Sequence, residues 1–238
     1  MKRILIDVDT QFDFMHPDGS LYVPAEESVL DAIKNTLESG NYDAVLGSVD
    51  SHAYDAWEFQ ENGGPFPAHC VKGQRGWLRL HSELPTRQRF IPMTWHNVNY
   101  PIDFESTVMV GESIEGDGVR TLNPYDLASE AVDKKVALYF EKEVYSLFSN
   151  PFAAPTLRAI VEELKFEDWK DVQIDVMGYC AGGYCVDAAV KGLFSMGGFQ
   201  KANIRVLAYA SAAIGGEEGM EKSRQELTEL GAEWVVSP

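Results

Sequence analysis

The chain has 238 residues, a length that fits one large domain or two small ones. Its 37 acidic and 20 basic side chains give a formal net charge of −17, which disfavours binding to nucleic acid or to anionic membrane surfaces. Hydrophobic residues make up 45% of the chain, and no apolar run approaches the ~18–20 residues that span a bilayer. The N-terminus lacks a signal-peptide core and the three cysteines suggest no disulfide framework, so we expect a globular cytoplasmic protein.

Short apolar segments alternate with amphipathic segments along the chain. Strands are predicted at residues 3–9, 43–49, 136–140, 172–177, 204–209 and 232–236. Helices are predicted at about residues 30–40, 155–169, 184 onward and 217–230. This alternation is typical of βαβ units, so we predict an α/β fold with a mostly parallel sheet of about six strands and helices on both faces.

One long segment, residues 71–135, breaks this alternation. It is rich in Pro, Asn and Gly and shows no sustained periodicity. We interpret residues 80–135 as a long excursion from the sheet, with a hairpin around residues 116–118. Because no linker or repeat divides the chain, we predict a single domain over residues 1–238.

Reactive side chains follow four of the predicted strands. Ligands of parallel sheets bind beyond the carboxyl ends of the strands, which is where these residues would lie. The four positions supply an acid, a metal-binding pair, a cation and a nucleophile, namely Asp9, Asp50 with His52, Lys142 and Cys185. A solvated loop residue is the ordinary alternative for Lys142, and an acid that caps the next turn is the alternative for Asp9.

Asp50 and His52 are two residues apart, so in an extended segment both side chains point to the same side. His69 follows in a loop shaped by Gly and Pro. Two histidines and one carboxylate with an open position are the ligand set of catalytic zinc and non-haem iron sites. An ordinary solvated Asp with two loop histidines is the alternative, which the Asp-x-His pattern alone would favour.

Cys185 lies where a predicted strand gives way to a helix. A helix N-terminus stabilises a thiolate and offers backbone N–H groups to an oxyanion. A buried structural cysteine is the alternative, and it suits Cys180 better, whereas Cys70 could be a metal ligand or a bystander. The chain contains no dinucleotide-binding, P-loop or G-x-S-x-G motif, which disfavours nucleotide binding and a serine hydrolase.

Taken together, these segments resemble the nicotinamidase/pyrazinamidase branch of the isochorismatase-like cysteine hydrolases. The matching segments are residues 9–14, 50–52, 63–71, 142–148 and 184–186. The resemblance implies a catalytic triad of Asp9, Lys142 and Cys185. It also implies metal ligands at Asp50, His52 and His69. Finally, it implies substrate-binding aromatic residues at Phe14, Phe66 and Tyr184. The chain departs from the family pattern at Ser51 and Phe66, and its loop before Cys185 is one residue longer than usual.

The resemblance also implies an activity, namely hydrolysis of nicotinamide to nicotinate and ammonia through a cysteine thioester. One divalent metal ion would position the pyridine ring, with zinc expected and iron or manganese as alternatives. Two other functions stay open: a hydrolase of another small amide, such as an N-carbamoyl or ureido compound, and an inactive metal-binding homologue. We expect a small-molecule amide as partner, and a homo-oligomer is compatible with the sequence.

Overall fold

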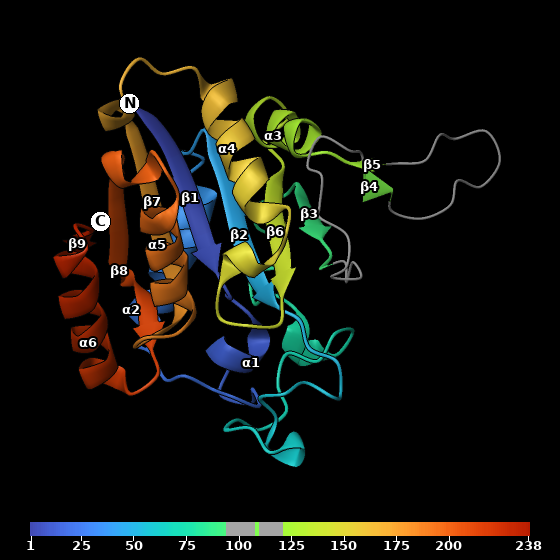
Figure 1. Ribbon diagram of the computed structural model, residues 1–238. Helices are drawn as coiled ribbons and strands as arrows, with labels where there is room; N and C mark the ends of the chain where they lie inside the picture. The colour runs from blue at the N-terminus through green and yellow to red at the C-terminus, as the bar shows by residue number, and fades with distance from the viewer. Residues whose placement is uncertain (94–107, 110–120) are drawn as a thin grey trace.

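The computed structural model describes residues 1–93, 108–109 and 121–238 (Figure 1). Its centre is a seven-stranded sheet in the order β3-β6-β2-β1-β7-β8-β9, in which every neighbouring pair is parallel. The strands are β1 (Lys2–Val8), β2 (Ala44–Asp50), β3 (Gln88–Ile91), β6 (Ala137–Lys142), β7 (Val172–Ala181), β8 (Asn203–Ala213) and β9 (Glu233–Val235). A separate antiparallel pair joins β4 (Val108–Met109) to β5 (Thr121–Leu122).

Helices lie on both faces of the sheet, as Figure 1 shows with α4 and α5 in front and α2 behind. The α-helices are α1 (Phe12–Met15), α2 (Glu27–Glu38), α3 (Pro124–Val132), α4 (Ala153–Leu164), α5 (Cys185–Ser195) and α6 (Gly216–Glu229). Short 3-10 helices are η1 (Gln60–Asn62), η2 (Arg75–Trp77), η3 (Leu147–Ser149), η4 (Trp169–Asp171) and η5 (Phe199–Lys201). No helix among the described residues is long and apolar enough to cross a membrane.

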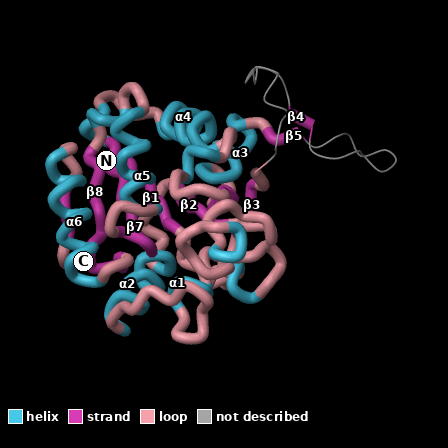
Figure 2. The backbone as a smooth tube through the Cα atoms, turned by 60° about the horizontal axis from the view of Figure 1, so that its bottom comes forward, coloured by secondary structure: helices cyan, strands magenta, loops and turns pink. Residues whose placement is uncertain are grey.

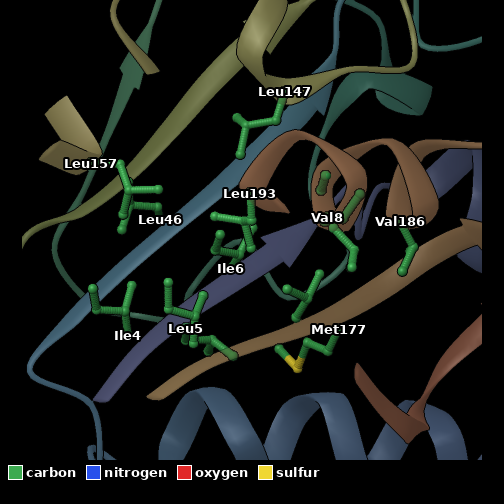
Figure 3. Packing of buried hydrophobic residues seen from close by; sticks show 14 of the residues in the cluster. Ile4, Leu5, Ile6, Val8, Leu46, Leu147, Leu157, Met177, Val186 and Leu193 are labelled. Carbon is green, nitrogen blue, oxygen red and sulfur yellow. The ribbon is translucent and has the colours of Figure 1, made fainter. Parts of the chain in front are cut away.

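The core forms where the helices cover the central strands. Ile4, Leu5 and Ile6 of β1 are all fully buried, because a strand covered on both faces buries consecutive side chains rather than alternate ones. Val186 and Leu193 of α5 pack on one face of this strand (Figure 3). At about 1.5–3 kcal/mol for each large apolar side chain, this burial favours the doubly covered sheet that the sequence predicts.

The predicted α/β class and parallel sheet are confirmed, but the sheet has seven strands rather than about six. The extra strand is β3, which lies inside the segment that we interpreted as an excursion from the sheet. It pairs with β6. Its four residues, of which only Ile91 is fully buried, are too few to show a periodicity of two.

The same segment contains α3, which the sequence analysis also missed. Asn123 caps this helix by accepting a hydrogen bond from the Tyr125 N–H (2.8 Å), and Pro124 occupies its first turn. This Asn-Pro start is a known helix signal that could have been used. The hairpin predicted around residues 116–118 lies outside the described residues.

Two predicted boundaries also shift. The helix predicted to reach residue 169 ends at Leu164, because Lys165 takes a left-handed conformation (φ 47°) that stops the helix. β7 runs to Ala181 instead of ending near residue 177, which carries the chain farther toward the turn that precedes Cys185.

Candidate functional site

The candidate site lies at the carboxyl edge of the central strands, which Figure 2 brings forward together with the loops that surround it. Asp9 directly follows β1, Asp50 ends β2 and Lys142 ends β6. Asp50 and Lys142 are register partners in the parallel β2–β6 pair, so they reach this edge side by side. Cys185 is the first residue of α5, which follows β7, the strand next to β1 in the sheet.

The Lys142 side chain joins the predicted catalytic residues. Its Nζ atom lies 2.8 Å from Asp9 Oδ2, 2.9 Å from Asp50 Oδ1 and 3.5 Å from Cys185 Sγ. The lysine is fully buried. Burial opposes its charge, but the carboxylates of Asp50 and Asp9 outweigh burial and hold the pKa of Lys142 well above its usual value. The site therefore contains a fixed ammonium group shared by two carboxylates and a thiol.

Asp9 shares the Lys142 ammonium group with the Cys185 thiol. It has an unusual positive φ of 47°, and its Oδ1 atom accepts a hydrogen bond from Ser48 Oγ (2.7 Å). Burial raises the pKa of Asp9 above its usual value, although Lys142 opposes the shift. The pKa of Cys185 is also raised, first by its hydrogen bond with Cys180 and then by burial. A thiol of this kind needs a base in order to ionise, and Asp9 shares its lysine partner.

A second group of side chains lies beside the first and has the composition of a metal site. One potential ligand atom from each of Asp50, His52, Glu58 and His69 lies within 4.8 Å of the other three. His52 Nε2 is 3.0 Å from Asp50 Oδ2 and 2.6 Å from Glu58 Oε1. His69 Nε2 is 3.5 Å and 3.4 Å from the same two atoms. The structure thus brings together the three predicted metal ligands and adds Glu58.

Glu58 is the residue that sequence reasoning missed. It lies in the loop between the two histidines, six residues after His52. This spacing differs from the interval between Asp50 and His52 and from the interval between His52 and His69. Its backbone is held by the Phe66 N–H (3.0 Å), and a Cβ atom on Gly64 would meet that backbone at 2.1 Å. The sequence signal that could have indicated Glu58 is an acidic residue directly before an aromatic one, Phe59. In the structure Phe59 is almost completely buried.

The donor set fits a divalent cation. His69 Nδ1 bonds to the Pro67 carbonyl (2.8 Å), which leaves Nε2 of that ring facing the two carboxylates. Burial lowers the basicity of both imidazoles, but Asp50 and Glu58 outweigh it and raise the pKa of His52 to about 9 and that of His69 to about 10. The carboxylates of Asp50 and Glu58 therefore favour a positive charge beside them. A cation such as zinc, which takes nitrogen and carboxylate ligands, would supply that charge.

Two polar residues near the N-terminus hold the backbone of this site. The Asp50 N–H donates to Gln11 Oε1 (2.7 Å), and Gln11 Nε2 donates to the Asp50 carbonyl (2.8 Å). The Cys70 N–H, next to His69, donates to Asp13 Oδ2 (2.7 Å). Both lie within the segment 9–14 that carries the family resemblance. They act through the backbone of the ligand segments, so residue type alone did not indicate their role.

A small cavity is lined by Cys185 of the first group, by three members of the second group and by four aromatic residues. Tyr145 and Tyr184 lie edge to face with ring centroids 5.4 Å apart, and Phe66 contacts Tyr184 at 6.1 Å. Tyr145 lies in the same cavity as the three residues for which the resemblance implies substrate binding. The cavity is lined by Phe14, Leu21, Asp50, Glu58, Phe66, His69, Tyr145, Cys180, Tyr184, Cys185 and Ile214.

Solved structures with the same architecture carry known activities. A pyrazinamidase of Pyrococcus horikoshii in complex with zinc has a TM-score of 0.59 and 22% sequence identity, covering 99% of each chain. The yeast nicotinamidase Pnc1p bound to the inhibitor nicotinaldehyde has a TM-score of 0.62 and 17% identity, covering 99% of this chain and 100% of its own. This chain shares its fold with these two proteins. An isochorismatase-like hydrolase from Alkaliphilus metalliredigens also matches (TM-score 0.57, 14% identity, coverage 99% and 96%).

The resemblance stated from the sequence is therefore confirmed for the fold over nearly the whole chain. No protein-family model matches the chain, and no curated protein matches its sequence. At identities of 14–22% the similarity to these solved structures extends to the architecture. The chemistry has to be argued from the residues of this site.

Proposed function

We propose that the protein is a cysteine amidohydrolase that converts nicotinamide to nicotinate and ammonia. The observation that carries the proposal is the position of Lys142 Nζ, which contacts Asp9, Asp50 and Cys185 at one point. A nucleophile and a potential metal ligand line the same cavity as four aromatic residues, and the lysine that contacts both of them also pairs with the proton acceptor Asp9. The nicotinamidase fold of the chain supports the same reaction class.

The reaction would begin with transfer of the Cys185 proton to Asp9, whose raised pKa suits it to hold that proton. The sulfur then forms a bond to the amide carbon, and Asp9 returns the proton to the nitrogen so that ammonia can leave. A water molecule, deprotonated by Asp9, cleaves the resulting thioester and frees the acid. Lys142 stabilises the thiolate and keeps the Asp9 carboxylate in place throughout.

Asp50, His52, Glu58 and His69 would hold the metal ion next to this triad. When bound, the ion supplies a Lewis-acidic position for a ring nitrogen. Phe14, Phe66, Tyr145 and Tyr184 would enclose the ring, so that the carboxamide is oriented toward Cys185 before reaction.

The lining of the cavity also bears on the alternative substrates. Among the described residues that line it there is no lysine or arginine, while Asp50 and Glu58 are both acidic. Lys142 is already paired with two carboxylates. An N-carbamoyl amino acid carries a carboxylate for which this lining offers no lysine or arginine side chain, so we propose an uncharged aromatic amide.

The experiment is ammonia release from nicotinamide by purified protein that is metal-stripped, then reloaded with zinc, iron or manganese. We expect release that depends on metal and that is lost in Cys185→Ala. An N-carbamoyl amino acid serves as the comparison substrate and should give no ammonia. Turnover of the N-carbamoyl compound alone would move the assignment to the second substrate class. Tight metal binding with no turnover of either compound would support the inactive homologue.

A further inference from the structure

A buried ion pair lies close to the candidate site, and the proposed reaction does not use it. Asp7 is on β1, two residues before Asp9. Its Oδ2 atom accepts a hydrogen bond from Arg79 Nη2 (2.8 Å), and both side chains are fully buried. A buried carboxylate needs a partner, and Arg79 supplies it.

The pair is enclosed by residues from three adjoining strands. Tyr139 of β6, Gly47 of β2 and Asp7 of β1 are register partners. The Tyr139 hydroxyl reaches across Gly47 and donates to Asp7 Oδ2 (2.9 Å). A Cβ atom on Gly47 would lie 2.5 Å from Tyr139 Cε1, so only glycine leaves room for this contact. The Arg79 guanidinium lies over the tyrosine ring, with Cζ 3.9 Å from its centroid. The guanidinium is therefore held by a carboxylate and by an aromatic face.

The backbone on either side of Arg79 pairs with the chain just beyond β1. Residues 78–80 form an antiparallel bridge with residues 10–12, through backbone hydrogen bonds of 2.8 Å and 2.9 Å. Within the second segment, Thr10 Oγ1 donates to Asp7 Oδ2 (3.2 Å), the same oxygen that Arg79 contacts. The ion pair and the two chain segments thus form one connected unit.

Asp9 lies inside this unit in a strained conformation. Its φ of 47° is in the left-handed region, which is costly for a residue other than glycine and persists where neighbouring contacts hold it. The Asp9 N–H donates to the Ser48 carbonyl (3.1 Å), and the Gln11 N–H donates to the Asp9 carbonyl (2.8 Å). The hydrogen bond from Thr10 to Asp7 spans the turn that Asp9 makes.

We propose that Asp7 and Arg79 are positioning residues that hold Asp9 in the conformation in which it contacts Lys142. This inference rests on the proposed function, in which Asp9 accepts and returns the proton. A buried ion pair is often no more stabilising than apolar side chains of similar volume, but its directed contacts favour one arrangement of the chain. Because a displacement of about 1 Å near a reacting group can cost about 100-fold in rate, loosening the pair should lower kcat.

Two variants loosen the unit in different ways. Thr10→Val removes the hydroxyl that donates to Asp7, and Arg79→Lys keeps the positive charge but loses the planar fork. We expect each to lower kcat for nicotinamide about 10–100-fold and to leave KM within about threefold, because Asp9 acts in the chemical step. Thr156→Val is the matched control, because Thr156 is also fully buried but lies in α4, and it should keep the wild-type kcat.

Amide hydrogen exchange gives a readout that needs no substrate. It is measured by mass spectrometry on the metal-free protein, for a peptide spanning residues 8–12 and for a reference peptide spanning residues 172–177 of β7. Both variants should exchange roughly tenfold faster than wild type in the first peptide and at the wild-type rate in the second. A general loss of stability would instead speed exchange in both peptides.

Two results would overturn the proposal. One is wild-type exchange at residues 8–12 in both variants, which would show that Asp9 is held without the pair. The other is faster exchange there with an unchanged kcat, which would leave the pair a purely structural role. If the wild-type protein releases no ammonia from nicotinamide, the proposed function fails, and the exchange rates still decide whether the pair holds Asp9. Thr10→Val carries the comparison if Arg79→Lys does not fold.

Discussion

Substitution of Gln11 by alanine tests whether the backbone of the metal site is held from the N-terminal segment. The Gln11 amide is fully buried and makes hydrogen bonds with the Asp50 N–H, the Asp50 carbonyl and the Trp77 carbonyl. Gln11→Ala leaves these backbone groups without their partner. A buried polar group that loses its partner costs about 1–3 kcal/mol, so two such groups on Asp50 cost roughly 3 kcal/mol once some water enters the space. That loss is about a hundredfold in the folding equilibrium.

The same substitution should weaken metal binding, because Asp50 supplies a potential ligand from the segment that Gln11 holds. Loss of a residue that orients a metal ligand typically costs about 10–100-fold in affinity. The free energy of unfolding is measured by urea denaturation of the metal-free protein, and zinc affinity by competition with a chromogenic chelator.

Gln173→Ala is the matched control. Gln173 is also buried and donates two side-chain hydrogen bonds, to Asp175 Oδ1 (3.1 Å) and Oδ2 (2.9 Å). It lies near the start of β7, so it is at the amino-terminal end of that strand and not at the carboxyl end where the candidate site lies. This variant should lose stability while keeping its zinc affinity. The reasoning fails if Gln11→Ala retains wild-type zinc affinity, or if Gln173→Ala weakens zinc binding equally.

Three further outcomes are expected. Because the pKa values of about 9 for His52 and about 10 for His69 keep both rings protonated in the metal-free fold at neutral pH, zinc must displace those protons. Zinc affinity should therefore rise with pH up to about pH 10, and calorimetry in buffers of different ionisation enthalpy should show proton release; a flat profile would contradict this. The Gly182 N–H, in the turn before Cys185, donates to Ser223 Oγ. Ser223→Ala removes this acceptor and should slow alkylation of Cys185 by iodoacetamide, because the turn that places Cys185 at the start of α5 is then held less firmly. A variant that only lost stability would keep the wild-type alkylation rate. Leu157→Ala empties a fully buried position and should cost about 3–5 kcal/mol in urea denaturation, and a cost below about 1 kcal/mol would show that the core can collapse there.

Sequence reasoning located the central strands and the residues at their ends because burial on both faces leaves continuous apolar runs. The run Ile4-Leu5-Ile6 and the acid at residue 9 are visible without any structure. β3 escaped because an edge strand of four residues has too few buried positions to form a pattern. Its pairing with β6 depends on contacts across almost fifty residues of sequence, which local propensity does not encode.

The candidate site divides in the same way. Residues whose side-chain type is itself reactive, such as Cys185 and His52, can be noticed one at a time. Glu58 has no such distinction among the many acids of this chain, and only the path of the loop brings it to His52 at 2.6 Å. Gln11 was quoted as part of a motif, but its role lies in the backbone groups that it holds, which become visible only in three dimensions.

The Asp50 carboxylate has one oxygen 2.9 Å from Lys142 Nζ and the other 3.0 Å from His52 Nε2. One side chain thereby belongs to the candidate metal group and also contacts the lysine of the predicted triad, so the two groups cannot diverge independently. A descendant that lost the metal by replacing Asp50 would also leave Lys142 with Asp9 as its remaining carboxylate partner at this site. We therefore expect that a metal-free enzyme could evolve from this scaffold by substitutions at the histidines or at Glu58 more readily than by substitution of Asp50.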